Sequence, residues 1–205
     1  MTENIIWLGH ASFKIINEKV VYIDPWKIKE KERGLAELLL ITHEHYDHCS
    51  PEDIAKLCKS DTQVVAPGDC VSKISGQATA IKPGDILTIK GITLEAVPAY
   101  NLKKPYHPKA NGWVGYIITI GEERIYHAGD TDLIPEMERI KADIALLPCG
   151  GTYTMDAIEA AQAANKIKPK LAIPMHYGSI IGTEKDVQRF KENVRGVEVQ
   201  VLTQE

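Results

Sequence analysis

The sequence has few of the features that mark secreted, membrane-spanning or polyanion-binding proteins. Its four cysteines show no CxxC spacing, so we expect reduced, mostly buried thiols and no disulfide framework. No apolar run approaches the ~20 residues of a membrane-spanning helix, and the net charge of −4 gives no general attraction to nucleic acid or membrane. Residues 1–4 lead directly into a strand-like run instead of a signal peptide. We therefore expect a cytoplasmic protein.

Linkers and repeats are also missing from the sequence. No composition shift and no run rich in Ser, Gly or Pro divides the 205 residues, and no short repeat or low-complexity segment is present. With 44% hydrophobic and 25% charged residues, the chain has an ordinary globular composition. We predict a single domain over residues 1–205, long enough for one sizeable core, and the sequence leaves its oligomeric state open.

Short β-branched runs predict a sheet in the first part of the chain, and strands alternate with helices in the last part. The runs NIIWLGH, ASFKII and KVVYIDP are separated by turn residues, as in a β-meander. ELLLITH is continuously apolar, which favours a strand buried on both faces. Later strands are expected at residues 143–147, 171–175 and 197–202, with helices capped by Thr154 and Thr183 between them. This order predicts an α/β architecture, a mixed sheet covered by helices.

The histidines are concentrated in one short segment. Only seven occur in the chain, yet three of them fall in the stretch HEHYDH. A buried strand precedes this stretch and a Ser-Pro helix start follows it, so it forms a strand-to-helix corner. In extended backbone, residues two apart point the same way, so His43 and His45 can reach one point while Asp47 and His48 turn toward a second. This crowding predicts a site for Zn, Mn or Fe instead of a solvated polar loop.

Two later segments also have a polar side chain directly after a buried strand. Asp130 follows RIYHAG, where its carboxylate could bridge two ions, and His176 follows LAIPM. Both stand where the carboxyl end of a strand meets a loop, the usual place of ligand sites in layered α/β folds. A lone Asp or His in a loop is more often structural. Together with the HEHYDH stretch, however, the two residues predict a site for one or two divalent transition metal ions.

These phrases resemble the metallo-β-lactamase superfamily. The similarity runs along almost the whole chain, through WLGHASFKI, VYIDP, THEHYDH, IYHAGDTD, ALLPCGGTYTM and IPMHYG. Within the superfamily, the phrases are most similar to the L-ascorbate-6-phosphate lactonase-like branch of metal-dependent hydrolases. The resemblance implies an α/β fold, a four-layer αββα sandwich of two mixed β-sheets flanked by helices, with one or two metals at one edge of the paired sheets.

The resemblance also implies six metal ligands, of which two bind a first ion, three bind a second ion and one bridges both. In that order they are His43 and His45, then Asp47, His48 and His176, then Asp130. Zn is the metal we expect first. Mn and Fe stay open as alternatives, because the same ligands accept all three.

One position departs from the family pattern. The superfamily usually supplies a third first-site histidine in an Ala-x-His sequence, whereas this chain has PAYN, with Asn101 at that place. Asn is a weaker metal ligand than imidazole. His107 lies in the same loop and could fill the place, contact the substrate or be a surface residue. If neither binds, a first ion would be held only by His43, His45 and the bridging Asp130.

Further residues are candidates for supporting or lining the site: Asp24, His127, His10 and Tyr177. A ligand imidazole needs its second nitrogen held by a carboxylate or carbonyl, which makes Asp24 and His127 candidates for support. Asp24 could instead form a plain Asp-Pro turn, and His10 could be a satisfied hairpin histidine that the family likeness moves to the site. Tyr177 is one of several aromatic residues after strands that could form an apolar wall for the substrate.

Such a site predicts a metal-dependent hydrolase. A metal-bound water can have its pKa lowered from ~15.7 to about 7. Asp47 could orient this water or pass a proton to the leaving group, and His107 is the second candidate for a catalytic role. If Lys103, Lys104 and Lys109 line the mouth of the site, they favour a small anionic ester or lactone; otherwise they form a solvated face.

Two other functions stay open at this point. A phosphodiesterase acting on a nucleotide or nucleic acid could use the same metals. A non-hydrolytic metal or ligand sensor would explain the missing third histidine. Nucleic acid is not favoured as a partner, because the chain has no extended basic tract, and no membrane partner is expected. We expect a small, anionic molecule as substrate.

Overall fold

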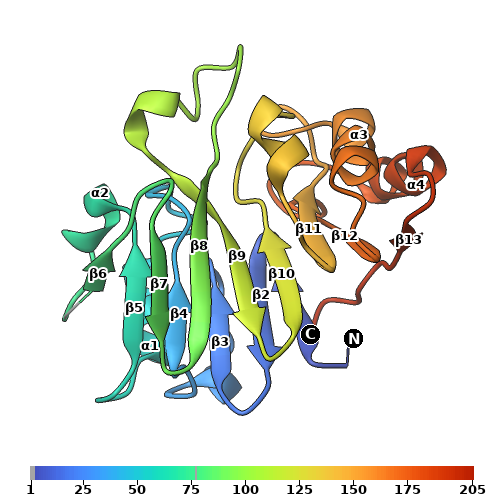
Figure 1. The fold of residues 1–205 in the computed structure, drawn as a ribbon. Helices are drawn as coiled ribbons and strands as arrows, with labels where there is room; N and C mark the ends of the chain where they lie inside the picture. The colour runs from blue at the N-terminus through green and yellow to red at the C-terminus, as the bar shows by residue number, and fades with distance from the viewer. Residues whose placement is uncertain (1–2, 77) are drawn as a thin grey trace. The chain divides into compact units, whose positions relative to one another are not determined.

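A computed structural model describes residues 3–76 and 78–205, which form two compact units. Unit 1 comprises Met1–Lys82 with Thr203–Glu205, and unit 2 comprises Pro83–Leu202. Each unit contains one mixed β-sheet and its own helices (Figure 1). No helix in the described ranges has the length and apolar character needed to span a membrane.

The sheet of unit 1 has six strands that are adjacent in the order of the chain. They are β1 (Ile5–Gly9), β2 (Ser12–Ile16), β3 (Val20–Ile23), β4 (Leu38–Leu40), β5 (Gln63–Ala66) and β6 (Ala78–Ala80). β1, β2 and β3 pair antiparallel, which confirms the predicted meander, and β3 to β6 pair in parallel. All three residues of β4 are buried, as its apolar run predicts. The chain that leaves β4 carries the histidine-rich stretch.

The helices of unit 1 are short and follow the strands. They are η1 (Glu30–Glu32), α1 (Pro51–Leu57) and α2 (Gly68–Val71). α1 begins as predicted, because the hydroxyl of Ser50 accepts from the backbone N–H of Asp53 and a proline occupies the first helical position. Ile54 and Leu57 of this helix belong to the same buried cluster as Leu39 of β4. The core therefore fixes both ends of the histidine-rich stretch.

The sheet of unit 2 changes from antiparallel to parallel pairing at β10. In spatial order its strands are β13 (Glu198–Val199), β12 (Leu171–Met175), β11 (Ile144–Pro148), β10 (Glu123–His127), β9 (Val114–Ile120), β8 (Ile92–Pro98) and β7 (Ile86–Ile89). β7 to β10 pair antiparallel, and β10 to β13 pair in parallel. The carboxyl ends of β10, β11 and β12 therefore share one edge of the sheet. The predicted last strand is reduced to two residues that pair only with the start of β12.

Two longer helices accompany this sheet, α3 (Ala157–Ile167) and α4 (Glu184–Asn193). The predicted cap of α3 at Thr154 is wrong. Asp156 caps the helix instead, because its carboxylate accepts two backbone N–H groups of the first turn and Glu159 reaches back to its backbone, whereas Thr154 is completely buried before the helix begins. Thr183 caps α4 as predicted, and Asp186 accepts from its backbone N–H. α3 packs against β11 and α4.

A long loop joins β8 to β9 and extends beyond the strand ends (Figure 1). It contains η2 (Lys109–Asn111), and another short helix, η3 (Pro135–Arg139), follows β10. Two backbone hydrogen bonds close the loop, from Ala99 to Trp113 at 3.1 Å and from Asn101 to His107 at 2.8 Å. These bonds hold the loop in a defined shape although it has little regular structure.

Candidate metal centre

The histidine-rich stretch of unit 1 turns directly after β4. The backbone N–H groups of His48 and Cys49 both donate to the carbonyl of His45, at 3.0 and 2.8 Å. The side chains of His43, Asp47 and His48 are buried, and His45 is half-buried. The turn therefore gathers four potential metal donors from six consecutive residues into one small region.

The imidazoles of this stretch lie close enough to share an ion. Nε2 of His43 is 3.2 Å from Nδ1 of His45, and the rings of His43 and His48 have centroids 4.0 Å apart. Donor atoms of Asp24, His43 and His48 all lie within 4.8 Å of one another. Two nitrogens that bind one tetrahedral zinc at ~2.1 Å stand about 3.4 Å apart, so the spacing of His43 and His45 fits a common ion.

Asp24 supports this stretch from the turn after β3. It is completely buried and has a left-handed backbone, with φ of 46°. Its Oδ1 accepts from the backbone N–H of Thr42 at 2.8 Å, and its Oδ2 accepts from Thr42 Oγ1 at 2.6 Å and from His48 Nδ1 at 2.8 Å. An ionised carboxylate can only accept, so Nδ1 of His48 carries a proton, and in the neutral imidazole Nε2 then carries the lone pair. Asp24 therefore orients His48 as well as forming its turn.

Thr42 extends the effect of Asp24 to His43. The single hydroxyl proton of Thr42 is donated to Asp24, so the hydroxyl oxygen must accept from Nδ1 of His43 at 2.9 Å. The Nε2 of His43 therefore carries the lone pair, as in His48. Thr42 is not among the residues predicted from the sequence, where its position directly before the first histidine is the local signal for this role.

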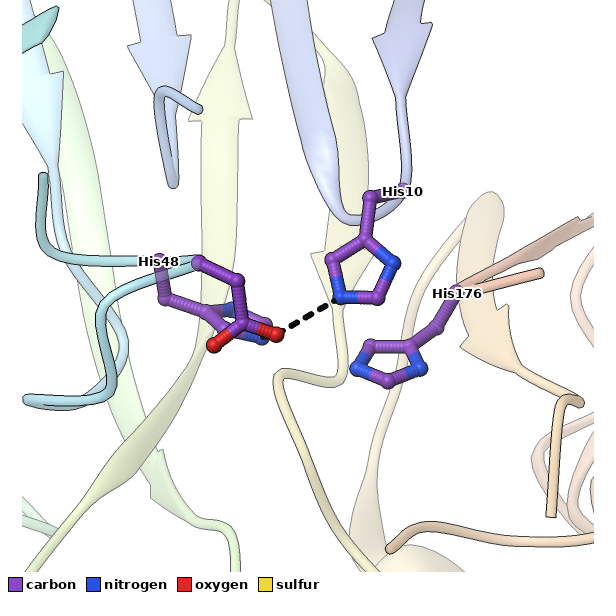
Figure 2. A group of neighbouring side chains, drawn as sticks. His10, His48 and His176 are labelled. Atoms are coloured by element: carbon purple, nitrogen blue, oxygen red, sulfur yellow. Dashed lines mark hydrogen bonds and ion pairs between the residues drawn. The ribbon is translucent and has the colours of Figure 1, made fainter. Parts of the chain in front are cut away.

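His10 lies in the turn between β1 and β2, against Asp47. Its Nε2 is 2.9 Å from Oδ2 of Asp47, the bond drawn in Figure 2. The His10 ring also lies 5.2 Å from the ring of Trp26 and 5.6 Å from that of His48, between centroids. Its backbone is left-handed, with φ of 52°, a conformation that costs energy for a residue with a Cβ. The structure thus brings His10 to the histidine-rich stretch, where it holds the carboxylate of Asp47.

Unit 2 gathers its donors from three separate segments. Asp130 follows β10, His176 follows β12 and His107 lies in the loop between β8 and β9. Oδ2 of Asp130 is 3.1 Å from Nε2 of His176 and 3.3 Å from Nε2 of His107. The three residues are 4% exposed or less. One buried carboxylate oxygen therefore faces two imidazoles that are distant from each other in the sequence.

Asn101 and His107, the two candidates for the third first-site ligand, are bonded to each other. Oδ1 of Asn101 accepts from the backbone N–H of His107 at 3.0 Å and lies 3.1 Å from its Nδ1. Nδ2 of Asn101 donates to Oδ1 of Asp132 at 3.0 Å and to the carbonyl of Tyr153 at 2.9 Å. This geometry favours His107 as the donor and Asn101 as its support. Asp132 is not among the predicted site residues, although it follows Asp130 by two residues in the GDTD phrase.

His176 is the residue after β12 and has a left-handed backbone, with φ of 60°. The loop after β11 passes directly beside it at Gly150. A Cβ on Gly150 would overlap the carbonyl oxygen of His176 and stand 3.1 Å from Cγ2 of Ile181. Only glycine fits there, so the close approach of two backbones fixes the position of His176.

His127 and Tyr177 are buried, and each stands close to one of these donors in the sequence. His127 ends β10, and its Nδ1 accepts from the backbone N–H of Gly129 at 3.2 Å, which supports the turn that carries Asp130. Tyr177 is 2% exposed, and burial raises the pKa of its phenol to about 12. Its hydroxyl therefore stays protonated at neutral pH. Because it is so deeply buried, Tyr177 belongs to the interior of unit 2 and is not an exposed wall.

The lysines near His107 are mostly bound to carboxylates of unit 2. Lys104 lies 2.7 Å from Asp132, and Lys109 lies 2.9 Å from Glu136. Lys103, in the same loop, is exposed. Much of the positive charge of the loop is therefore neutralised internally, which weakens the expectation that all three lysines meet an anion.

The chemistry of these donor sets fits a divalent transition metal. Each unit offers buried imidazole nitrogens together with carboxylate oxygens, the ligands that suit Zn, Mn and Fe. The hydrogen bonds of Asp24 and Thr42 leave the lone pairs of two imidazoles on Nε2, as a ligand requires. The His and Asp residues are therefore able to hold a metal.

Comparisons with known proteins agree with this chemistry. The family whose model matches, over residues 4–176, is the beta-lactamase superfamily domain. A UPF0173 metal-dependent hydrolase of Thermoplasma acidophilum is 40% identical, with 91% of this chain and 88% of the relative covered. A UPF0173 metal-dependent hydrolase of Thermoplasma volcanium is 36% identical, with 98% and 96% covered.

Solved structures show the same fold. A candidate metal-dependent hydrolase of Parabacteroides distasonis is 35% identical, with a TM-score of 0.88 and coverage of 97% of this chain and 93% of the other. A metallo hydrolase of Ignicoccus hospitalis is 25% identical, with a TM-score of 0.79 and coverage of 97% and 94%. The predicted fold class, two mixed β-sheets flanked by helices, is confirmed. The chain belongs to the metallo-β-lactamase superfamily, among its metal-dependent hydrolases.

Proposed function

We propose that the protein hydrolyses a small anionic ester or lactone with water activated by one or two divalent transition metal ions. The observation that carries this proposal is the buried carboxylate of Asp130 between two imidazoles, His107 and His176. A carboxylate oxygen in such a position is suited to bridging two ions, which is the role that the family likeness implies for it.

The proposed ligands form two sets joined by Asp130. By the family likeness, His43, His45 and His107 would hold a first ion, and Asp47, His48 and His176 would hold a second. The close nitrogens of His43 and His45 in unit 1 support the first set. We assign Zn as the metal, with Mn or Fe as alternatives that metal analysis distinguishes.

The residues of the chain prepare the site for water attack. When bound, divalent ions would lower the pKa of a water from ~15.7 to about 7 and would neutralise charge on the oxyanion. Asp47 would orient the water and carry a proton toward the leaving group, and Nε2 of His10 lies 2.9 Å from its carboxylate and holds it in place. Burial of the donor residues excludes bulk water from the reacting atoms.

The choice of an anionic ester or lactone rests on the resemblance to the L-ascorbate-6-phosphate lactonase-like branch. The exposed Lys103 in the loop of His107 supports it, since its charge is available to a phosphate or carboxylate of a substrate. The sensor alternative is weakened, because His107 offers the imidazole whose apparent lack was its main argument. We further propose that the protein acts in the cytoplasm on a small molecule, without nucleic acid or a membrane as partner.

Metal analysis tests the first part of this proposal. Protein purified without chelator and reconstituted with Zn, Mn or Fe is expected to hold between one and two equivalents of metal, and Asp130→Asn is expected to lose metal and activity together. Asp143→Asn is the matched control, because Asp143 lies before β11 and is bonded to Lys170 at 2.9 Å. Metal content near zero after reconstitution, or full occupancy in Asp130→Asn, would contradict the assignment.

Substrate panels test the second part. We expect phosphorylated sugar lactones to be hydrolysed faster than neutral lactones and bis-aryl phosphodiesters. Preference for the phosphodiesters would replace the lactonase proposal by a phosphodiesterase. Metal-loaded protein that hydrolyses nothing at any pH would replace it by a sensor.

A further inference from the structure

His107 is held by a network that lies entirely within unit 2. Its backbone N–H and its ring Nδ1 both meet Oδ1 of Asn101, at 3.0 and 3.1 Å, and its backbone carbonyl accepts from Asn101 at 2.8 Å. The ring also lies edge-on to Trp113, with centroids 5.5 Å apart. With both backbone groups and one ring nitrogen held, the orientation of the imidazole is fixed.

The direction of the Asn101 amide follows from its partners. Nδ2 lies 3.0 Å from the carboxylate of Asp132 and 2.9 Å from the carbonyl of Tyr153, and both of these groups can only accept. The NH₂ group must therefore face them, because the opposite orientation would set the amide oxygen against two other oxygens. The amide oxygen is left to face His107.

This direction sets the tautomer of His107. The amide oxygen of Asn101 can only accept, so Nδ1 of His107 is the ring nitrogen that carries the proton. A neutral His107 then has its lone pair on Nε2, as a metal ligand requires, and Nε2 is the atom that lies 3.3 Å from Oδ2 of Asp130. A chain of three residues thus leads from the carboxylate of Asp132 to the donor atom of His107.

Asp132 is itself held firmly by groups that donate to it. The backbone N–H of Leu102 donates to Oδ2 at 2.8 Å, and Nζ of Lys104 donates to Oδ1 at 2.7 Å. Lys104 is anchored in turn by the carbonyl of Thr154. Asp132 is 5% exposed, so these donors hold its carboxylate in a nearly buried position.

We propose that Asp132 is a positioning residue which, through the amide of Asn101, keeps a proton on Nδ1 of His107 and so presents Nε2 as the metal-binding atom. This inference rests on the proposed function, in which His107 is a ligand. It assigns Asn101, the residue at the place of the missing family histidine, to holding the replacement ligand instead of binding metal.

Two measurements test the proposal on Asp132→Asn. The ring ¹⁵N chemical shifts of His107 in metal-free protein report its tautomer, with the signal assigned by its loss in His107→Gln. The carboxylate of Asp132 offers two oxygens to the groups that donate to it, whereas the amide in the variant offers one oxygen and an NH₂ group. The amide of Asn101 therefore loses its fixed direction. We expect a population of the Nε2-protonated tautomer and a fall of first-site Zn affinity by about 10- to 100-fold, the range for loss of a group that supports a ligand.

A reciprocal exchange guards against a variant that merely folds poorly. Asn101→Asp sets two carboxylates against each other and is expected to weaken Zn binding. The double variant Asn101→Asp/Asp132→Asn keeps an acceptor beside His107 and restores a donor beside that acceptor. The new carboxylate meets the carbonyl of Tyr153 in both variants, so the double variant is expected to regain part of the affinity that Asn101→Asp alone loses. Asp143→Asn, a carboxylate of the same unit bonded to Lys170, is expected to change neither measurement.

The outcomes separate this inference from the proposed function. An unchanged His107 tautomer in folded Asp132→Asn, or no recovery in the double variant, would overturn the role of Asp132. Failure of the wild-type protein to bind metal would overturn the proposed function and the metal-site part of this inference. The tautomer result does not depend on bound metal or on turnover, so it distinguishes the two failures.

Discussion

The two units arrange their donors in opposite ways. Unit 1 carries His43, His45, Asp47 and His48 in one stretch of six residues, and a single turn folds them together. Unit 2 takes its donors from three loops that lie far apart in the sequence and meet at the carboxyl ends of its strands. A donor set in one segment depends mainly on local backbone, whereas a scattered set depends on the whole sheet.

The supporting carboxylates differ in the same way. Asp24 bonds to His48 directly and reaches His43 through the hydroxyl of Thr42. Asp132 reaches only His107, through the amide of Asn101. Each carboxylate fixes which ring nitrogen carries a proton, but Asp24 governs two imidazoles. The comparison predicts that changes at Asp24 have the larger effect.

Among changes to the two supporting carboxylates, the larger loss of metal affinity is expected from Asp24→Asn. Asn tolerates the left-handed backbone of this position, so the turn is kept. Its single amide oxygen cannot accept from the backbone and hydroxyl of Thr42 and from His48 together, so metal affinity should fall by about 100-fold, the upper end of the range for loss of a supporting group. Titration of the protein with Zn against a chromophoric chelator measures this change.

Thr42→Val is the matched variant for this prediction, because it removes the hydroxyl that joins Asp24 to His43 but leaves Asp24 bonded to His48 and to the backbone N–H of residue 42. Its loss of affinity is expected to be smaller than that of Asp24→Asn. Equal losses in the two variants would mean that Asp24 acts only through Thr42, and the difference between the two units would disappear.

An intermediate effect is expected from Gly150→Ala, which tests whether tertiary packing places the donors of unit 2. The added methyl would push the carbonyl of His176, at a cost of about 1–3 kcal/mol for overpacking. Urea unfolding measures the stability, and Zn titration measures the accompanying loss of affinity. Gly68→Ala in unit 1, where a Cβ meets no atom within 4 Å, should stay within ~0.5 kcal/mol of the wild type. Equal stability of both variants would contradict the close approach at His176.

The smallest effect, a change in the free energy of unfolding, is expected at Asp143, which lies at the amino-terminal edge of the parallel strands. Hydrogen bonds from Lys170 and from the backbone N–H of Arg124 lower the pKa of this carboxyl. Because the folded pKa is lowered, the stabilisation is complete above the unfolded value of about 3.9 and is lost as pH falls through the folded pKa. Asp143→Asn should cost at most about 1 kcal/mol at neutral pH.

Urea unfolding at neutral and acid pH checks the direction of this pKa shift. The difference in free energy of unfolding between the wild type and Asp143→Asn should shrink as the solution is acidified through the folded pKa. A difference that grows toward acid pH would contradict the direction of the pKa shift. Unchanged Zn affinity would show that this edge of unit 2 is separate from the donors.

Much of the fold could be read from residue patterns, with errors where local signals compete. Sequence patterns predicted β4, the Ser50 cap and the meander, because burial and capping require particular residue types at regular or fixed positions. The cap of α3 was misassigned to Thr154, since two good capping residues stand close together and only the actual bonds select Asp156. β6 and α2 left no clear pattern, because they are short and partly exposed.

The sequence by itself determined the donor types, the corner that carries four of them and the family of the fold. These depend on residues close together in the chain and on strand ends that apolar runs mark. Only the tertiary structure decided that Asn101 supports His107, that Thr42 and Asp132 belong to the donor networks and that Gly150 packs on His176. The direction of a hydrogen bond and the tautomer of an imidazole depend on partners brought together by folding, and spacing along the chain does not encode them.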